Sequence, residues 1–105
     1  MEYRILGRTG FKVSLLSLGS GGARSLGQAL GHTQHQQTTL VRRALDLGIN
    51  LVDTSAHYGD AEVILGRALK GVPRNSYFLT TKWLALEDGK LVPDPNLLLE
   101  GINRS

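Results

Sequence analysis

Three residues of the types that serve acid–base chemistry follow two apolar segments of the chain. Asp53 ends the segment 49–53, Tyr58 lies in the stretch after it, and Lys82 comes directly after the segment 77–81. If both segments are parallel strands, their carboxyl ends share one rim, which is where α/β barrels place their active sites. We therefore expect these three polar groups, from distant parts of the sequence, to converge at that rim.

The chemistry that such a group could perform is proton donation to a carbonyl oxygen. A free tyrosine, with a pKa of about 10, is a poor acid at neutral pH. A neighbouring ammonium group favours the phenolate, and a carboxylate can hold that ammonium charged and oriented. In this interpretation Tyr58 is the proton donor, Lys82 supplies the positive charge and Asp53 orients Lys82. The hydride must come from a cofactor, because no side chain carries one.

The hydrophobic pattern predicts the strands that would position these residues. Alternating residues on both sides of the glycine-bearing turn 7–10 predict an N-terminal β-hairpin. The apolar segment 14–18 predicts a strand that ends at Gly19. Two further strands are expected at 49–53 and 77–81, where apolar, β-branched and aromatic residues are concentrated.

A loop and a helix are expected between the strands that end at Gly19 and Asp53. Residues 23–35, which include two glycines, are expected to form a loop. Thr33 and Gln36 have the spacing of a capping box, so a helix would begin there and end at Gly48. Its apolar face would consist of Leu40, Val41, Ala44 and Leu45.

Two more helices complete the expected order. Asp60 would cap a second helix, which Gly71 would end, and Asp94 followed by Pro95 would begin a third helix over 96–105. Strands that alternate with helices predict parallel βα units. We therefore expect a single α/β domain.

Several motifs resemble those of the aldo/keto reductase family. The segment 48–59, GINLVDTSAHYG, is similar to the family signature G-(I/V)-N-x-(F/I/V)-D-T-A-x-x-Y-G, and 62–69 is similar to its E-x-x-L-G-x-A-L. Further similarities are LGRTG at 6–10 with the family's opening hairpin, TTK at 80–82 with its third strand, and GINRS at 101–105 with the helix before its fourth strand. The resemblance covers nearly the whole chain.

This resemblance implies a TIM barrel that reduces aldehydes and ketones with NADPH, or with NADH. Asp53, Tyr58 and Lys82 match three members of the family's catalytic tetrad, whose fourth member is a histidine after the next strand. The loop near the nicotinamide is matched by Gly19, Ser20 and Gly21, and Asp53 is counted among the cofactor-binding residues as well. The fold class expected is α/β, a partial (β/α)8 barrel with an N-terminal β-hairpin and about three βα units.

Composition argues against several other classes of protein. The chain carries 12 basic and 9 acidic residues, and the basic ones are scattered, so a nucleic-acid partner is not expected. No apolar segment approaches the ~20 residues that span a bilayer, so no membrane contact is expected. There is no cysteine, which agrees with a reducing compartment, and a cytoplasmic location is expected.

Two motifs that suggest other chemistry are set aside. The glycines of 19–22 resemble a dinucleotide-binding loop, but the third glycine of G-x-G-x-x-G would fall on Arg24, and the next acidic residue is Asp46. His32 and His35 have no third ligand nearby in the sequence, so no metal site is expected.

The length of 105 residues is far below the ~250 of a complete (β/α)8 barrel. We therefore interpret residues 1–105 as the N-terminal part of an aldo/keto reductase (NADP-dependent oxidoreductase) barrel domain, truncated and inactive by itself. The expected partner of the whole enzyme is a small carbonyl substrate. The alternative is a non-catalytic product that acts as a binding or assembly piece and self-associates through open sheet edges.

Overall fold

The structure is a computed structural model that describes residues 1–92 and 94–105. Its elements, in chain order, are β1 (Tyr3–Ile5), β2 (Lys12–Ser14), β3 (Leu18–Gly19), η1 (Ser25–Leu30), α1 (Gln34–Asp46), β4 (Leu51–Asp53), α2 (Ala61–Ala68), η2 (Arg74–Ser76), β5 (Phe78–Thr80), β6 (Leu86–Glu87), β7 (Lys90–Leu91) and α3 (Pro95–Arg104). The expected alternation of strands and helices is thus confirmed.

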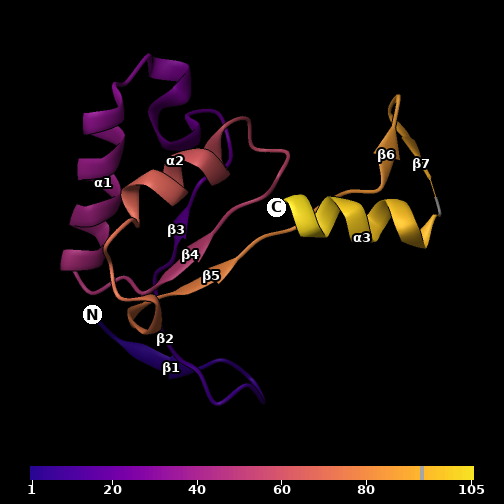
Figure 1. Ribbon diagram of the computed structural model, residues 1–105. Coiled ribbons are helices and arrows are strands. Elements are labelled where there is room, and N and C mark those ends of the chain that lie inside the picture. Colours follow the sequence, from indigo (N-terminus) through magenta and orange to yellow (C-terminus); the bar gives the residue numbers. More distant parts are fainter. Residues whose placement is uncertain (93) are drawn as a thin grey trace.

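The centre of the fold is an open, parallel sheet in the order β3-β4-β5. In its register Gly19 lies opposite Asp53, which in turn lies opposite Thr80. The carboxyl ends of all three strands therefore meet at one edge (Figure 1). This is an α/β fold of the kind expected, although the sheet stays open where a complete barrel would close.

Helices α1 and α2 pack against each other and against the sheet (Figure 1). The buried core joins Val41 of α1, Val52 of β4, and Ile64 and Leu65 of α2. Arg42 of α1 also donates to two backbone carbonyls at the end of α2, those of Ala68 at 2.7 Å and Lys70 at 2.6 Å. These bonds satisfy carbonyls that a helix end would otherwise leave unpaired.

The hairpin β1–β2 lies at the opposite end of the sheet from the strand ends that carry Asp53 (Figure 1). Asn50, just before β4, fastens it there. The Asn50 side chain accepts from the Ser14 amide at 2.7 Å and donates to the Lys12 carbonyl at 3.1 Å. The strand expected at 14–18 is therefore wrong in its bounds, because Ser14 belongs to the hairpin and only Leu18 and Gly19 form β3.

Helix α1 begins and ends as its sequence predicts. Thr33 and Gln36 form both bonds of the capping box, and Gly48 has a left-handed φ of 93° just past the helix. The expected apolar face of α1 is wrong at one position. Leu40, expected on the buried face, is 45% exposed, and Gln37 is buried on that face.

Two expectations beside the helices were wrong. Residues 25–30, expected as loop, form the short helix η1, which places Leu26 in the core. Asp60 stands directly before α2, but its side chain makes no capping bond to that helix. The Asp60 backbone N–H instead donates to the side chain of Gln28 at 2.8 Å.

The last part of the chain extends away from the α1–α2 body (Figure 1). A small hairpin, β6–β7, precedes α3. The Asp94 side chain accepts from the Asn96 amide at 2.9 Å, which confirms the cap expected for α3. Gly101 of α3 lies against the indole ring of Trp83, where a Cβ atom would have no room.

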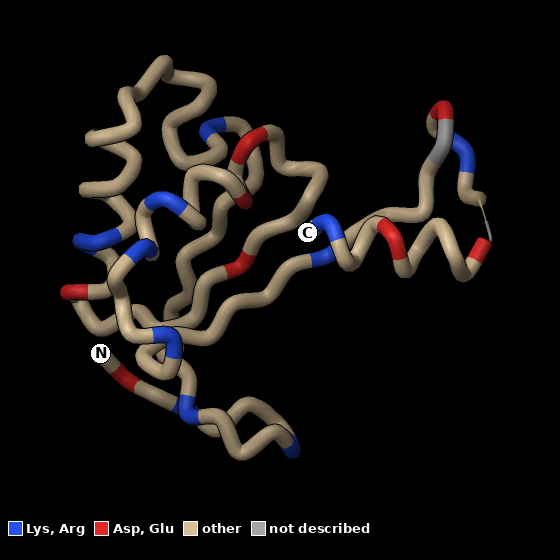
Figure 2. Tube along the Cα trace, in the orientation of Figure 1, with Lys and Arg blue, Asp and Glu red and all other residues tan. Residues whose placement is uncertain are grey.

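Lysine and arginine are spread over the hairpin, the helices and the C-terminal segment (Figure 2). They form no continuous stripe in this view, as their scattered positions in the sequence predict. Among the described residues, no helix is both long and apolar enough to cross a lipid bilayer.

Candidate active site

Asp53 and Lys82 form an ion pair at the carboxyl ends of β4 and β5. The Lys82 Nζ atom lies 3.0 Å from each of the two Asp53 carboxylate oxygens and donates at 2.8 Å to the Thr54 carbonyl. Thr80 Oγ1 donates to Asp53 Oδ1 at 2.6 Å from the neighbouring strand. The pair is half exposed, with 48% of the Lys82 side chain and 42% of the Asp53 side chain accessible.

The two charges stabilise each other's ionised forms. The hydrogen bond from Thr80, together with the bond to Lys82 and its charge, lowers the pKa of Asp53 below its ordinary value of 3.8, against a smaller effect of burial. The bond to Asp53 and its charge, with a smaller contribution from Tyr58, raise the pKa of Lys82 above 10.5. Lys82 therefore remains a cation at neutral pH.

Tyr58 lies in the loop after β4, and Lys82 faces its ring. The Lys82 Nζ atom is 5.1 Å from the ring centroid, within the range of a cation–π contact. Gly21 lies close on the ring, because a Cβ atom there would come within 2.8 Å of the Tyr58 ring carbons. The three residues that the sequence singled out are thus brought together.

The loop after β3 supports Asp53 from the other neighbouring strand. Ser20 is fully buried, and both its amide, at 3.0 Å, and its hydroxyl, at 2.8 Å, donate to the Asp53 carbonyl. Gly19 is exposed beside Asp53 and has open space where a side chain would project. In the loop matched to a nicotinamide site, Gly19 thus has an accessible backbone. The Ser20 hydroxyl is already hydrogen-bonded to Asp53, and Gly21 is in contact with the Tyr58 ring.

The loops that carry Tyr58 and Lys82 are joined by further hydrogen bonds. The Lys82 carbonyl accepts from the Ser55 hydroxyl at 3.0 Å and from the Ala56 amide at 3.1 Å. The Leu84 amide donates to His57 Nε2 at 3.0 Å. His57 therefore links the two loops.

Comparison with known proteins identifies the family of the chain. The sequence model of the aldo/keto reductase family matches residues 17–101. The chain belongs to this family. It is 40% identical over 94 residues to an L-galactose dehydrogenase of Arabidopsis thaliana, an alignment that covers 85% of the chain and 28% of the dehydrogenase.

The chain is also similar to two proteins with different names. A Schizosaccharomyces pombe protein named for a voltage-gated potassium channel subunit beta is 38% identical, over 100% of this aldo/keto reductase chain and 32% of its own length. The structure resembles an aldo-keto reductase of Bacillus halodurans in its holo form, with a TM-score of 0.66 and 33% identity, over 86% of this chain and 28% of the other. The chain thus spans about a third of the length of the curated relatives it matches.

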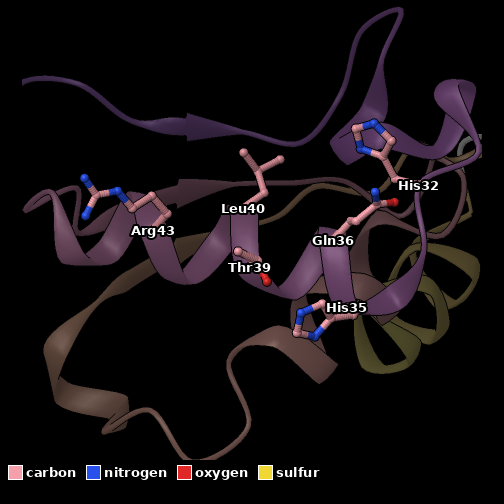
Figure 3. Close-up of a pocket in the computed structure, with 6 residues that line it drawn as sticks. All are labelled: His32, His35, Gln36, Thr39, Leu40 and Arg43. Carbon is pink, nitrogen blue, oxygen red and sulfur yellow. The ribbon is translucent and has the colours of Figure 1, made fainter.

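A hollow beside α1 lies away from the three catalytic candidates. It measures about 440 Å³, and Figure 3 shows the side chains that line it, which are those of His32, His35, Gln36, Thr39, Leu40 and Arg43. All six residues are exposed, so the hollow is a groove along the outer surface of the helix. Asp53, Tyr58 and Lys82 of this aldo/keto reductase chain lie at the strand ends instead.

Two residues of the site were missed in the sequence. Thr80 is the first cause of the lowered pKa of Asp53, and only the register of β4 with β5 places its hydroxyl there. Gln28 contacts the loop of Tyr58 from η1, a segment expected as loop. A glutamine in a glycine-rich stretch carries no pattern that would have found it.

Proposed function

We propose that the protein is an oxidoreductase that reduces aldehyde or ketone carbonyls with NAD(P)H, and that Tyr58 donates the proton. The observation that carries this proposal is the convergence of Tyr58 with the Lys82–Asp53 ion pair at the strand ends. The Lys82 ammonium group lies 5.1 Å from the centroid of the Tyr58 ring, so the proton donor and the cation share one site. A carboxylate with a lowered pKa holds that cation in place at neutral pH.

In the proposed reaction the carbonyl π bond opens, the carbon receives a hydride, and the oxygen receives the proton of Tyr58 Oη, which leaves an alcohol. NAD(P)H, when bound, supplies the hydride. The residues present fit one end of such a cofactor, because Gly19 offers bare, exposed backbone beside Asp53. The chain's own part is to hold the phenol, keep Lys82 charged and deliver the proton.

A chimera provides the test of this function. In it, residues 1–105 replace the aligned segment of the L-galactose dehydrogenase, which the chain matches at 40% identity. We expect the chimera to oxidise L-galactose with NAD(P)⁺, the reverse of the proposed reduction. Tyr58→Phe should lower the rate by about 10²–10⁴-fold, the usual contribution of a general acid or base.

Tyr77→Phe is the matched control, because Tyr77 is a buried tyrosine of the core, 8% exposed, and its ring is retained. We expect the 105-residue chain alone to show no turnover, since it spans about a third of the relatives' length. A chimera that turns over equally well with Tyr58→Phe would refute the role given to Tyr58.

The open sheet favours a second function, self-association as a non-catalytic assembly piece. In the part of the chain that the structure describes, β3 and β5 each pair only with β4. An unpaired strand edge is a template for pairing with another chain, and Leu79 in β5 is 40% exposed. Sedimentation equilibrium of the 105-residue chain tests this function, which predicts a concentration-dependent oligomer, whereas a monomer at all concentrations would exclude it.

A further inference from the structure

Gln28 connects η1 to the turn that carries Tyr58. Its Nε2 atom donates to the Tyr58 carbonyl at 3.1 Å and to the Ser25 carbonyl at 2.9 Å. Its Oε1 atom accepts from the Asp60 amide at 2.8 Å. The backbone partners fix the orientation of the side-chain amide, because an amide N–H needs an acceptor and a carbonyl needs a donor. One side chain thus bonds the backbone on both sides of Gly59.

Gly59 is shaped to admit this side chain. Its φ is +56°, a left-handed conformation that L residues rarely adopt, and a Cβ atom there would lie 2.5 Å from Gln28 Oε1. The glycine next to Tyr58 therefore meets two requirements at once, the turn of the backbone and the space for the amide of Gln28.

The other end of the connection is anchored in the core. Leu26, two residues before Gln28, is 6% exposed and packs in the cluster that includes Val52 of β4. Gln28 itself is half buried. Because η1 is held by the core and Gln28 is held by η1, the position of the Tyr58 backbone is tied to the same core that holds Asp53.

We propose that Gln28 is a positioning residue that holds Tyr58 against Lys82. This proposal rests on the proposed function, because Tyr58 needs positioning only if it is the proton donor. The position of Tyr58 relative to Lys82 can nevertheless be tested without turnover. The alternative is that Gln28 only orders the start of α2, through the bond from Asp60, whose own side chain makes no cap.

Two substitutions separate the two arms of the side chain. Gln28→Met keeps the length and removes both the donor and the acceptor. Gln28→Glu keeps the acceptor for the Asp60 amide but places a carboxylate oxygen against the Tyr58 carbonyl, where a donor is required. Gln34→Met is the matched control, because Gln34 is an exposed glutamine in the first turn of α1.

NMR of the 105-residue chain supplies two readouts. The first is hydrogen exchange of the Asp60 amide, which should quicken about fivefold to tenfold in Gln28→Met, as expected for one lost hydrogen bond, and remain slow in Gln28→Glu. The second is the ring-current shift of the Lys82 side chain, whose Nζ lies over the Tyr58 ring. We expect that shift to shrink in both Gln28 variants and to persist in Gln34→Met.

An unchanged Lys82 shift in both Gln28 variants would overturn the proposal and leave Gln28 as a stabiliser of α2 alone. If Gln28→Met unfolds, Gln28→Glu decides, since it retains the bond to Asp60. Gly59→Ala, which would push the amide away, should reproduce the loss of the Lys82 shift, and a retained shift there would also contradict the proposal. Failure of the chimera to turn over would refute the proposed function. It would not change the Asp60 exchange rate or the Lys82 shift, which test the position of Tyr58 separately.

Discussion

Replacing Asp53 by asparagine removes the negative charge that pairs with Lys82. The asparagine Oδ1 can still accept the hydrogen bond from Thr80, but an amide NH2 group replaces the second oxygen that accepts from Lys82 Nζ, so the charge attraction and one hydrogen bond are lost together. Because both side chains are more than 40% exposed, the pair is close to a surface ion pair, which contributes about 0.2–1 kcal/mol. We expect Asp53→Asn to lower the free energy of unfolding at pH 7 by roughly that amount, or by about 1–6 °C in Tm.

The pH dependence of this difference has a definite sign. The folded pKa of Asp53 lies below 3.8, so its contribution to stability is present above that ordinary value and is lost as the pH falls through the folded value. The folded pKa of Lys82 lies above 10.5, so its contribution is present below 10.5 and is lost as the pH rises through the folded value. The difference between wild type and Asp53→Asn should therefore be constant from about pH 5 to pH 9 and shrink in stronger acid.

Urea unfolding followed by the fluorescence of Trp83, the single tryptophan, measures this difference. Wild type and Asp53→Asn would be compared at pH 7 and near pH 3. Asp46→Asn is the matched control, because it removes an exposed carboxylate at the end of α1. An Asp53→Asn variant as stable as wild type at pH 7, or a difference that persists unchanged at pH 3, would refute the conclusion that the ionised Asp53 carboxylate stabilises the fold.

Three further substitutions test contacts of the site, of the hairpin and of the core. Gly21→Ala should displace the Tyr58 ring, because its Cβ would meet ring carbons at 2.8 Å, and should cost about 1–3 kcal/mol in urea unfolding, with a changed Lys82 ring-current shift as the second readout. Asn50→Ala should remove two bonds to the hairpin, cost about 1–3 kcal/mol and speed amide exchange at Ser14. Leu65→Ala, in the core at 2% exposed, should cost about 2–5 kcal/mol by thermal or urea unfolding; a loss below 1 kcal/mol would mean that this core is not packed as described.

The order of elements could be predicted because each boundary has a local cause. The capping box at Thr33, the glycine at 48 and the cap at Asp94 act within a few residues of themselves, and all three were confirmed. The errors concern non-local causes. Ser14 joins the hairpin because Asn50, far along the chain, binds its backbone. The helix η1 forms where Leu26 reaches a core made by other elements, which no local pattern shows.

The three central residues of the site could be predicted from the sequence, but the residues that hydrogen-bond to them or to their loops could not. Asp53, Tyr58 and Lys82 stand in a recognisable order, and the parallel sheet brings them together as expected. Thr80, Gln28 and the link from His57 follow from strand register and from side-chain geometry, which sequence spacing does not give. That residues 1–105 form one domain, and that Gly19, Ser20 and Gly21 contact a cofactor, stay predictions.

The contacts of the site divide the proposed reaction into two halves with different requirements. The Tyr58 backbone, the Lys82 ammonium group and Asp53 are held by bonds from η1, from the loop after β3, and from β4 and β5, all within the described residues. We infer that this segment organises delivery of the proton by itself. Gly19 is the most exposed residue of the loop matched to the nicotinamide, and a single bare glycine offers too few contacts to bind a dinucleotide. In the proposed reaction, delivery of the hydride would require further groups that complete the cofactor site, which is why the chimera, and not the isolated chain, is expected to turn over.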